Sequence, residues 1–265
     1  MSSLTICLEC KGQGKKSRKL RKQVRLRYQA ELEQYQHVKD KSPAPIRPKA
    51  PQYPCSNCNG SGLVNSTTTP IPNNENYPHV SIIGAGIGGV ALAVACLHRS
   101  IPFTLYERDY SFDTRSQGYG LTLQQAHKAM EGFGIFALKD GVVSTRHLVH
   151  TTEGKIIGEW GMRKWIQTNN NNPPKRTNIH IARQLLRKEL INQLGGENAV
   201  QWGHQLVGLK KCEDQSIELS FQTNDTIKTS KTNLVVGADG IRSAVRNFLL
   251  PDNISPLRYL GCIVI

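Results

Sequence analysis

The sequence contains no long hydrophobic run. Its first ten residues, MSSLTICLEC, lack the apolar stretch of about 7 to 15 residues that follows a basic segment in a secretory signal. Residues 79–97, HVSIIGAGIGGVALAVACL, resemble a short membrane span, but their four glycines would weaken a lone membrane helix, which needs about 20 apolar residues. We therefore expect no membrane span and a cytoplasmic, reducing location, where the seven cysteines act as metal ligands or buried thiols rather than disulfides.

Acidic residues are scarce, with 20 Asp and Glu against 34 Lys and Arg and a net charge of +14. Most of the excess lies in residues 1–72, which hold 13 basic and 4 acidic side chains (+9) and leave 21 and 16 (+5) for the rest. Such a basic segment can attract nucleic acid, an anionic membrane or an acidic protein. Aromatic residues make up only 6%, and no aromatic-interleaved motif of the RNA-recognition type is present, which argues against a nucleic-acid partner.

Composition divides the chain into a module at 1–64, a linker at 65–78 and an α/β domain at 79–265. Within the module, residues 15–41 show apolar side chains at helical spacing and predict a basic amphipathic helix. We expect its apolar stripe to pack on the flanking cysteine clusters; contact with RNA, a membrane or a protein is the alternative. Its members are Leu20, Val24, Tyr28, Leu32, Tyr35 and Val38.

Further elements are predicted in the α/β domain. Residues 124–135 and 182–196 read as helices, the second ending on glycines, and residues 216–221 and 232–238 read as strands. Residues 167–177 read as a polar loop without core-forming side chains.

An eight-residue pattern, CxxCxGxG, occurs twice, as CLECKGQG from Cys7 to Gly14 and as CSNCNGSG from Cys55 to Gly62. Two cysteines separated by two residues can place both thiolates on one metal ion, and two such pairs complete a tetrahedron. We expect one structural zinc ion; flexible redox-active dithiols are the alternative. The predicted ligands are Cys7, Cys10, Cys55 and Cys58.

This pattern resembles the zinc module of DnaJ-type co-chaperones, which carries four such repeats and binds two zinc ions. The two repeats present here suffice for one ion. The resemblance covers about 60 residues and includes no J-domain, so it implies a protein partner for the module but no co-chaperone activity.

A second motif, G-x-G-x-x-G, is formed by Gly84, Gly86 and Gly89 between a short apolar run and an alanine-rich helix. In a β-α-β unit the first glycine makes the turn, the second lets the backbone approach a pyrophosphate, and the third allows close packing of helix on strand. Glu107 ends the next predicted strand, where a carboxylate can accept hydrogen bonds from a ribose diol. NAD and FAD both fit this fingerprint.

Residues 234–246, LVVGADGIRSAVR, make the fingerprint specific. With the ERD tripeptide at 107–109, they resemble the class A flavoprotein monooxygenases of the para-hydroxybenzoate hydroxylase fold. The resemblance spans 79–265. It implies a Rossmann-like FAD-binding domain, in which a parallel sheet carries helices, followed by an incomplete substrate-domain sheet.

The resemblance also implies which residues contact FAD. Arg183 resembles the arginine that opens the family's mid-domain helix, and Arg115 resembles a pyrophosphate-facing arginine. Either can instead be a surface arginine, and Asp239 can be a helix N-cap. The implied set is Gly84, Gly86, Gly89, Glu107, Arg108, Arg115, Arg183, Asp239 and Gly240.

The implied activity is NAD(P)H-dependent hydroxylation of a small organic substrate, aromatic in many members, by dioxygen added at C4a of FAD. Because the cofactor carries that chemistry, we expect no catalytic side chain and treat the histidines as structural. The family's third motif, G-D-A-A-H-x-x-x-P, does not occur before Ile265, so we expect a fragment that binds FAD weakly and has no turnover. The alternatives are another FAD enzyme, such as a reductase or halogenase, or a zinc-knuckle interaction protein with a degenerate flavin domain.

Overall fold

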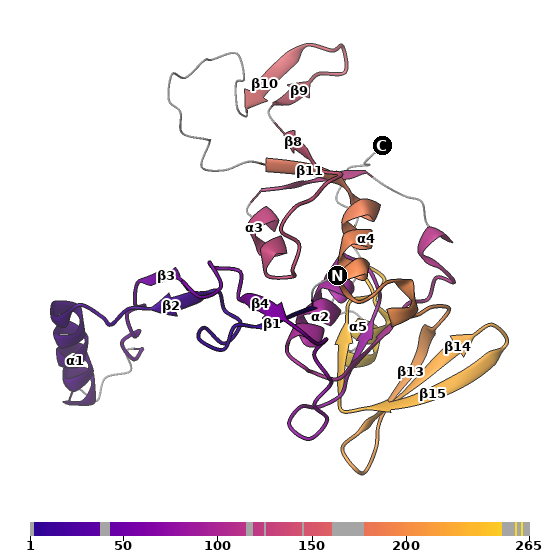
Figure 1. Ribbon diagram of the computed structural model, residues 1–265, viewed down its shortest axis with the longest axis horizontal. Helices are drawn as coiled ribbons and strands as arrows, with labels where there is room; N and C mark the ends of the chain where they lie inside the picture. The colour runs from indigo at the N-terminus through magenta and orange to yellow at the C-terminus, as the bar shows by residue number, and fades with distance from the viewer. Residues whose placement is uncertain are drawn as a thin grey trace. The chain divides into compact units, whose positions relative to one another are not determined.

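The computed structural model describes residues 3–37, 43–114, 119–124, 126–144, 146–160, 178–250, 258 and 261. The chain forms two compact units, Met1–Thr67 and Thr68–Ile265 (Figure 1), and each is described by itself.

The first unit consists of two small antiparallel sheets joined by the cysteine loops. Strand β1 (Ser3–Ile6) pairs with β4 (Leu63–Ser66), and β2 (Lys15–Ser17) pairs with β3 (Gln52–Pro54). One CxxCxGxG loop connects β1 to β2 and the other connects β3 to β4. Each loop is therefore anchored by a strand at both ends.

Helix α1 (Lys22–His37) lies between β2 and β3 and is shorter than predicted. Residues 15–17 form a strand instead, because their main chain pairs with β3, and Arg18 N continues the pairing with a hydrogen bond to Pro51 O of 2.8 Å. No residue of α1 is buried, so the expected packing of its stripe on the cysteine clusters is wrong for this helix. Among its apolar side chains, Val24 and Leu26 are 39% and 50% exposed.

The second unit is built on a four-stranded parallel sheet with the order β12-β6-β5-β16. After β5 (Val80–Ile83) the chain turns into α2 (Ile87–His98) and returns as β6 (Phe103–Tyr106), which is the predicted β-α-β unit. Residues 79–97 thus contain strand β5, a turn and all but the last residue of the twelve-residue helix α2. In the part of the chain that the structure describes, no helix has the length and apolar character to cross a membrane.

The two faces of the parallel sheet are covered differently. On one face, Val80 and Ile82 pack into the core that α2 and α4 (Arg183–Gln193) complete. On the other face, Ile83 and Tyr106 pack against a three-stranded antiparallel sheet and α5 (Ala244–Leu249). That sheet comprises β13 (Gln205–Lys211), β14 (Ile217–Thr223) and β15 (Thr226–Thr232) in sequence order. The unit is therefore layered, with a parallel sheet between helices and an antiparallel sheet.

The remaining described elements form a second region of the same unit. Strand β11 (Asn178–Ala182) lies between β7 (Gly120–Leu123) and β8 (Val142–Ser144), and β9 (His147–His150) pairs with β10 (Ile156–Trp160). The short elements are α3 (Ala126–Glu131), η1 (Phe112–Thr114), η2 (Glu197–Ala199) and β12 (Val200–Gln201).

The predicted elements of the domain are largely confirmed. Helix α4 ends before Gly195 and Gly196, which both take positive φ, while β14 and β16 (Leu234–Gly237) match the two predicted strands. The helix predicted at 124–135 is wrong in extent, because α3 stops at Glu131 and turns follow up to Gly134 at φ 82°. The predicted loop at 167–177 and Arg115 lie outside the described residues.

Candidate functional site

Two of the three motif glycines are required by the packing of the chain itself. Gly84 follows β5 with φ of 102°, and a Cβ there would lie 2.6 Å from Ala238 O. A Cβ on Gly89 would lie 1.9 Å from Gly84 O, well inside the range that carbon and oxygen tolerate. The first glycine therefore makes the turn and the third allows α2 to approach it, as the motif predicts.

Gly86 has a different environment. It is the N-cap of α2 with φ of −69°, which any residue adopts, and a Cβ there would meet no atom within 4 Å. No packing or backbone demand within the described chain explains a glycine here. The space beside it lies at the N-terminus of α2, where unpaired main-chain amides and the helix dipole favour an anion. This opening fits a diphosphate that approaches the backbone.

The second motif lies directly beside the glycine turn. Strand β16 runs parallel to β5 with Gly237 opposite Ile83, and Ala238 N donates to Ile83 O at 2.7 Å. A Cβ on Gly89 would also approach Ala238 Cβ to 3.2 Å. Two motifs about 150 residues apart in the sequence are thus adjacent in space.

Within the second motif, Asp239 is bonded to the start of α5. Its Oδ2 accepts from Ala244 N at 2.7 Å and Val245 N at 3.2 Å, and its Oδ1 accepts from Ser243 Oγ at 2.6 Å. Ser243 is the N-cap and accepts from Arg246 N at 3.0 Å. Asp239 is therefore not the N-cap residue, although its carboxylate bonds the first two amides of α5 as a capping group does. Gly240 takes a φ of 79° and has open space beside it.

Glu107 follows β6 and turns its carboxylate toward the glycine turn. Oε2 accepts from Ala85 N at 2.8 Å, while Oε1 accepts from Arg108 N at 2.9 Å and Asp109 N at 3.3 Å. A carboxylate offers about four acceptor positions, so about one position remains for a ligand hydroxyl.

The two predicted FAD-binding arginines that the structure describes, Arg183 and Arg108, lie on the surface. Arg183 opens α4 on the surface, with its guanidinium 5.9 Å from the centre of the Tyr119 ring. Arg108 is exposed beyond Glu107. No bond from either side chain to the glycine turn is present among the described contacts. The structure thus brings together the glycines, Glu107 and the Asp239 turn.

One residue of the site, Arg187, was missed from the sequence. It is buried on α4, its Nε donates to Ala85 O at 2.7 Å, and its Nη2 lies 3.8 Å from Glu107 Oε2. The available signal was a charged residue next to Leu186 and one turn before Leu190 and Ile191, on the apolar face of the predicted helix.

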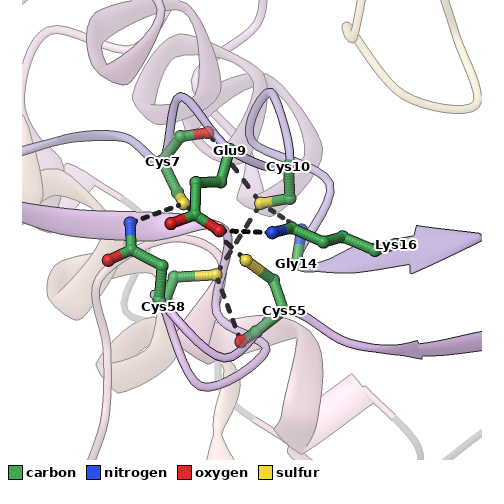
Figure 2. A network of polar contacts seen from close by, with 8 residues as sticks. Cys7, Glu9, Cys10, Gly14, Lys16, Cys55 and Cys58 are labelled. Carbon is green, nitrogen blue, oxygen red and sulfur yellow. Dashed lines mark hydrogen bonds and ion pairs between the residues drawn. The ribbon is translucent and has the colours of Figure 1, made fainter.

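The four motif cysteines of the first unit converge on one point (Figure 2). Their sulfur atoms all lie within 4.8 Å of one another, with 3.9 Å between Cys7 and Cys55 and 3.7 Å between Cys10 and Cys58. All four are buried and free. Zinc bonds to sulfur of about 2.3 Å separate the sulfurs of a tetrahedron by about 3.8 Å, so the spacing fits one zinc ion.

The two cysteine loops repeat the same bonds 48 residues apart. Gly14 N donates to Cys10 Sγ at 3.2 Å, and Gly62 N donates to Cys58 Sγ at the same distance. Both glycines take positive φ, and a Cβ on Gly14 would lie 2.1 Å from Gly60 O. The glycines therefore let the loops curl around the sulfurs and pack against each other.

Asn57 and Glu9 occupy equivalent positions in the two loops and differ in role. Asn57 Nδ2 donates to Cys7 Sγ at 3.2 Å, whereas Glu9 forms an ion pair with Lys16 (Figure 2). Hydrogen bonds from the Cys10 main chain and from Asn57 lower the pKa of the Cys7 thiol to about 6, while burial raises the pKa of Cys10 to about 11. The hydrogen bond from Asn57 therefore favours the thiolate of Cys7, the form in which cysteine binds metal, whereas burial disfavours the thiolate of Cys10.

The fold and the paired motifs define a nucleotide-binding flavoprotein domain, and the family comparison agrees. Residues 77–251 match the FAD binding domain family, and the chain belongs to this family.

Similar proteins include two curated relatives and one solved structure. A "Probable FAD-dependent monooxygenase" of Arthroderma benhamiae is 29% identical over 205 residues, which cover 73% of this chain and 42% of the relative. The "FAD-dependent monooxygenase thnD" of Trichoderma harzianum is 27% identical and covers 65% and 40%. The 2,6-dihydroxypyridine-3-hydroxylase of Arthrobacter nicotinovorans shares the fold with a TM-score of 0.52 and 21% identity, over 66% of this chain and 40% of that one. The chain thus spans about 42% of the first relative's length.

Proposed function

We propose that this chain is the FAD-binding part of a monooxygenase that uses NAD(P)H and dioxygen to hydroxylate a small organic substrate. The observation that carries the proposal is the opening beside Gly86, at the N-terminus of α2, next to the turn of the second motif. The names of the two fungal relatives support the reaction class.

The chain's own residues have binding roles in this proposal. The amides at Gly86 and the start of α2 receive the diphosphate, Glu107 accepts a hydrogen bond from a ribose hydroxyl, and the turn at Asp239 and Gly240 begins beside Gly84. For Arg108, Arg115 and Arg183 the family resemblance alone assigns a role in contacting FAD. When bound, FAD supplies electron transfer from NAD(P)H and the activation of dioxygen. No side chain of the chain acts as acid, base or nucleophile.

Binding tests the first part of the proposal. Titration of the 265-residue chain with FAD and with ADP, followed by calorimetry, should show saturable binding of both, because ADP carries the groups that this half of the site recognises. Absence of FAD binding by folded protein would contradict the proposal.

The reaction class is tested on the protein that carries the activity. A monooxygenase places one labelled atom from ¹⁸O₂ in the product and consumes NAD(P)H. A reductase incorporates none, and a halogenase gives a halogenated product. Either result would contradict the monooxygenase proposal and identify the protein as a reductase or a halogenase, respectively.

We also propose that Cys7, Cys10, Cys55 and Cys58 hold one structural zinc ion. Four buried sulfurs at tetrahedral spacing support it, and they leave no open position for a reacting ligand, so the ion would stabilise the loops. Elemental analysis of purified protein should give one zinc per chain. Metal-free protein with two disulfides would favour the redox-dithiol alternative.

A protein partner for residues 1–64 is the second proposed function. It is favoured by α1, a helix with no buried residue that begins in the most basic part of the chain. Reduced binding to an acidic partner on replacing Lys22 and Arg25 by glutamine would support it.

A further inference from the structure

The residue between the first two motif glycines is bonded on both sides by distant side chains. Ala85 is fully buried, its N–H donates to Glu107 Oε2 at 2.8 Å, and its carbonyl accepts from Arg187 Nε at 2.7 Å. Glu107 follows β6 and Arg187 lies on α4, so two separate elements meet at one residue of the turn.

Arg187 is enclosed by groups that suit a guanidinium. Its side chain is 9% exposed, its central carbon lies 5.1 Å from the centre of the Phe112 ring and 5.4 Å from that of Trp202, and Glu107 supplies the opposite charge. These contacts restrict the guanidinium in several directions. A buried ion pair is by itself weak evidence for stabilisation, since apolar replacements of such pairs are often neutral. The role of Arg187 is therefore better sought in the groups that it orients than in its contribution to the stability of the fold.

Peptide geometry links Arg187 to the opening beside Gly86. The carbonyl of Ala85 and the N–H of Gly86 belong to one planar, trans peptide group, so they point in opposite directions. When Arg187 bonds the carbonyl, it sets the direction of the Gly86 N–H. In the same way, the Glu107 bond to Ala85 N sets the plane of the preceding peptide, from Gly84 to Ala85. Both peptide groups of the turn are thus oriented by side chains.

We propose that Arg187 is a positioning residue of the cofactor site, which aims the Gly86 amide at the diphosphate and holds the Glu107 carboxylate for the ribose. This inference rests on the proposed FAD binding and extends it to a residue outside the two motifs. Arg187 acts through Ala85 and Glu107 and needs no contact with the cofactor.

The test measures FAD and ADP dissociation constants for the 265-residue chain and its variants. Arg187→Met keeps the length of the side chain but removes its charge and donors, and Arg187→Lys keeps only the charge. Lys188→Met, at the exposed neighbouring position of α4, is the matched control. Loss of a hydrogen-bonded charged group should weaken binding by about 10- to 100-fold in Arg187→Met, by less in Arg187→Lys and by less than about twofold in the control.

A double-substitution cycle separates positioning from general support of the fold. Because Arg187 acts partly through the Gly86 amide and partly through Glu107, Arg187→Met should weaken binding by less, though still measurably, when Gly86→Ala is already present. Additive losses in the cycle would overturn the inference, as would unchanged affinity in folded Arg187→Met. If Arg187→Met does not fold, Arg187→Lys decides; unchanged affinity, or failure of that variant to fold as well, assigns Arg187 a purely structural role. An unsubstituted chain that binds neither FAD nor ADP overturns the proposed function, a result distinct from all of these.

Discussion

Alanine at Gly86 should reduce the affinity for FAD and alanine at Gly89 should reduce stability, although the two glycines are three residues apart in one motif. Gly86→Ala places a methyl group in open space that the chain does not fill, at a φ of −69° that alanine adopts without strain. Its cost to folding is that of an N-cap change, at most about 1 kcal/mol. The methyl group does, however, enter the space assigned to the diphosphate. Losing contacts between amides and a charged group should weaken FAD binding by about 10- to 100-fold.

Gly89→Ala acts on the fold instead. Its methyl carbon would lie 1.9 Å from Gly84 O and 3.2 Å from Ala238 Cβ, so α2 must move away from the turn by more than an ångström. Overpacking of this kind costs about 1 to 3 kcal/mol of unfolding free energy. In a domain of this size that lowers the Tm by roughly 2 to 12 °C.

Differential scanning calorimetry without ligand and FAD titration below the transition measure the two effects separately. Gly86→Ala should change the affinity strongly and the Tm little, whereas Gly89→Ala should change the Tm strongly. Normal FAD affinity in Gly86→Ala would refute the assignment of the opening to the diphosphate. A Tm for Gly89→Ala equal to that of the parent would refute the packing argument.

Three further predictions concern other parts of the chain. Removing metal with a chelator should unfold residues 3–66 and leave FAD affinity within about twofold, because the cysteines and the glycine turn lie in separate compact units; circular dichroism and titration check this. Arg183→Ala should weaken FAD binding by about tenfold without changing Tm, since the side chain is exposed, and a lowered Tm with unchanged affinity would make it a structural residue. Burial lowers the pKa of His98 to about 4, so the unfolded chain binds a proton at this histidine before the folded chain does as pH falls below about 6.5. The free energy of unfolding should therefore drop by about 2 to 3 kcal/mol between pH 6.5 and 4. His98→Leu should flatten that part of the pH profile of denaturation.

Much of the fold could be predicted because periodicity and glycine placement act locally. Strand β5, helix α2 and strand β6 follow from an apolar run, a glycine turn and an alanine-rich segment, and α4 ends where two glycines take positive φ. The helix prediction includes residues 15–17 because the charged stretch that carries the apolar stripe begins at Lys15, although the stripe itself begins only at Leu20. Residues 15–17 form a strand because they pair with β3, 35 to 39 residues later, and local spacing does not report such a partner.

The positions of motif residues that follow strands could be predicted from the sequence. Contacts between side chains from distant segments could not. That Gly84 and Ala238 touch follows from two parallel strands that end at the same edge of the sheet. Arg187 was missed because its role depends on its position relative to Ala85 and Glu107, which come from two other segments. Asn57 was missed similarly, since CxxCxGxG leaves that position unspecified and only the folded loops bring its amide to Cys7.

The polar side chains of the two motifs are largely occupied by the protein itself. Asp239 and Ser243 bond to the start of α5, and Glu107 bonds to three main-chain amides. What remains open beside the turn is main chain, at Gly86 and Gly240. In the proposed site, these two motifs would therefore recognise the diphosphate through backbone amides, while Glu107 and Asp239 hold that backbone in place. Replacing Glu107 or Asp239 should thus reduce the affinity for FAD in proportion to how far the turn is then free to move. The loss of the negative charge itself should affect the affinity less.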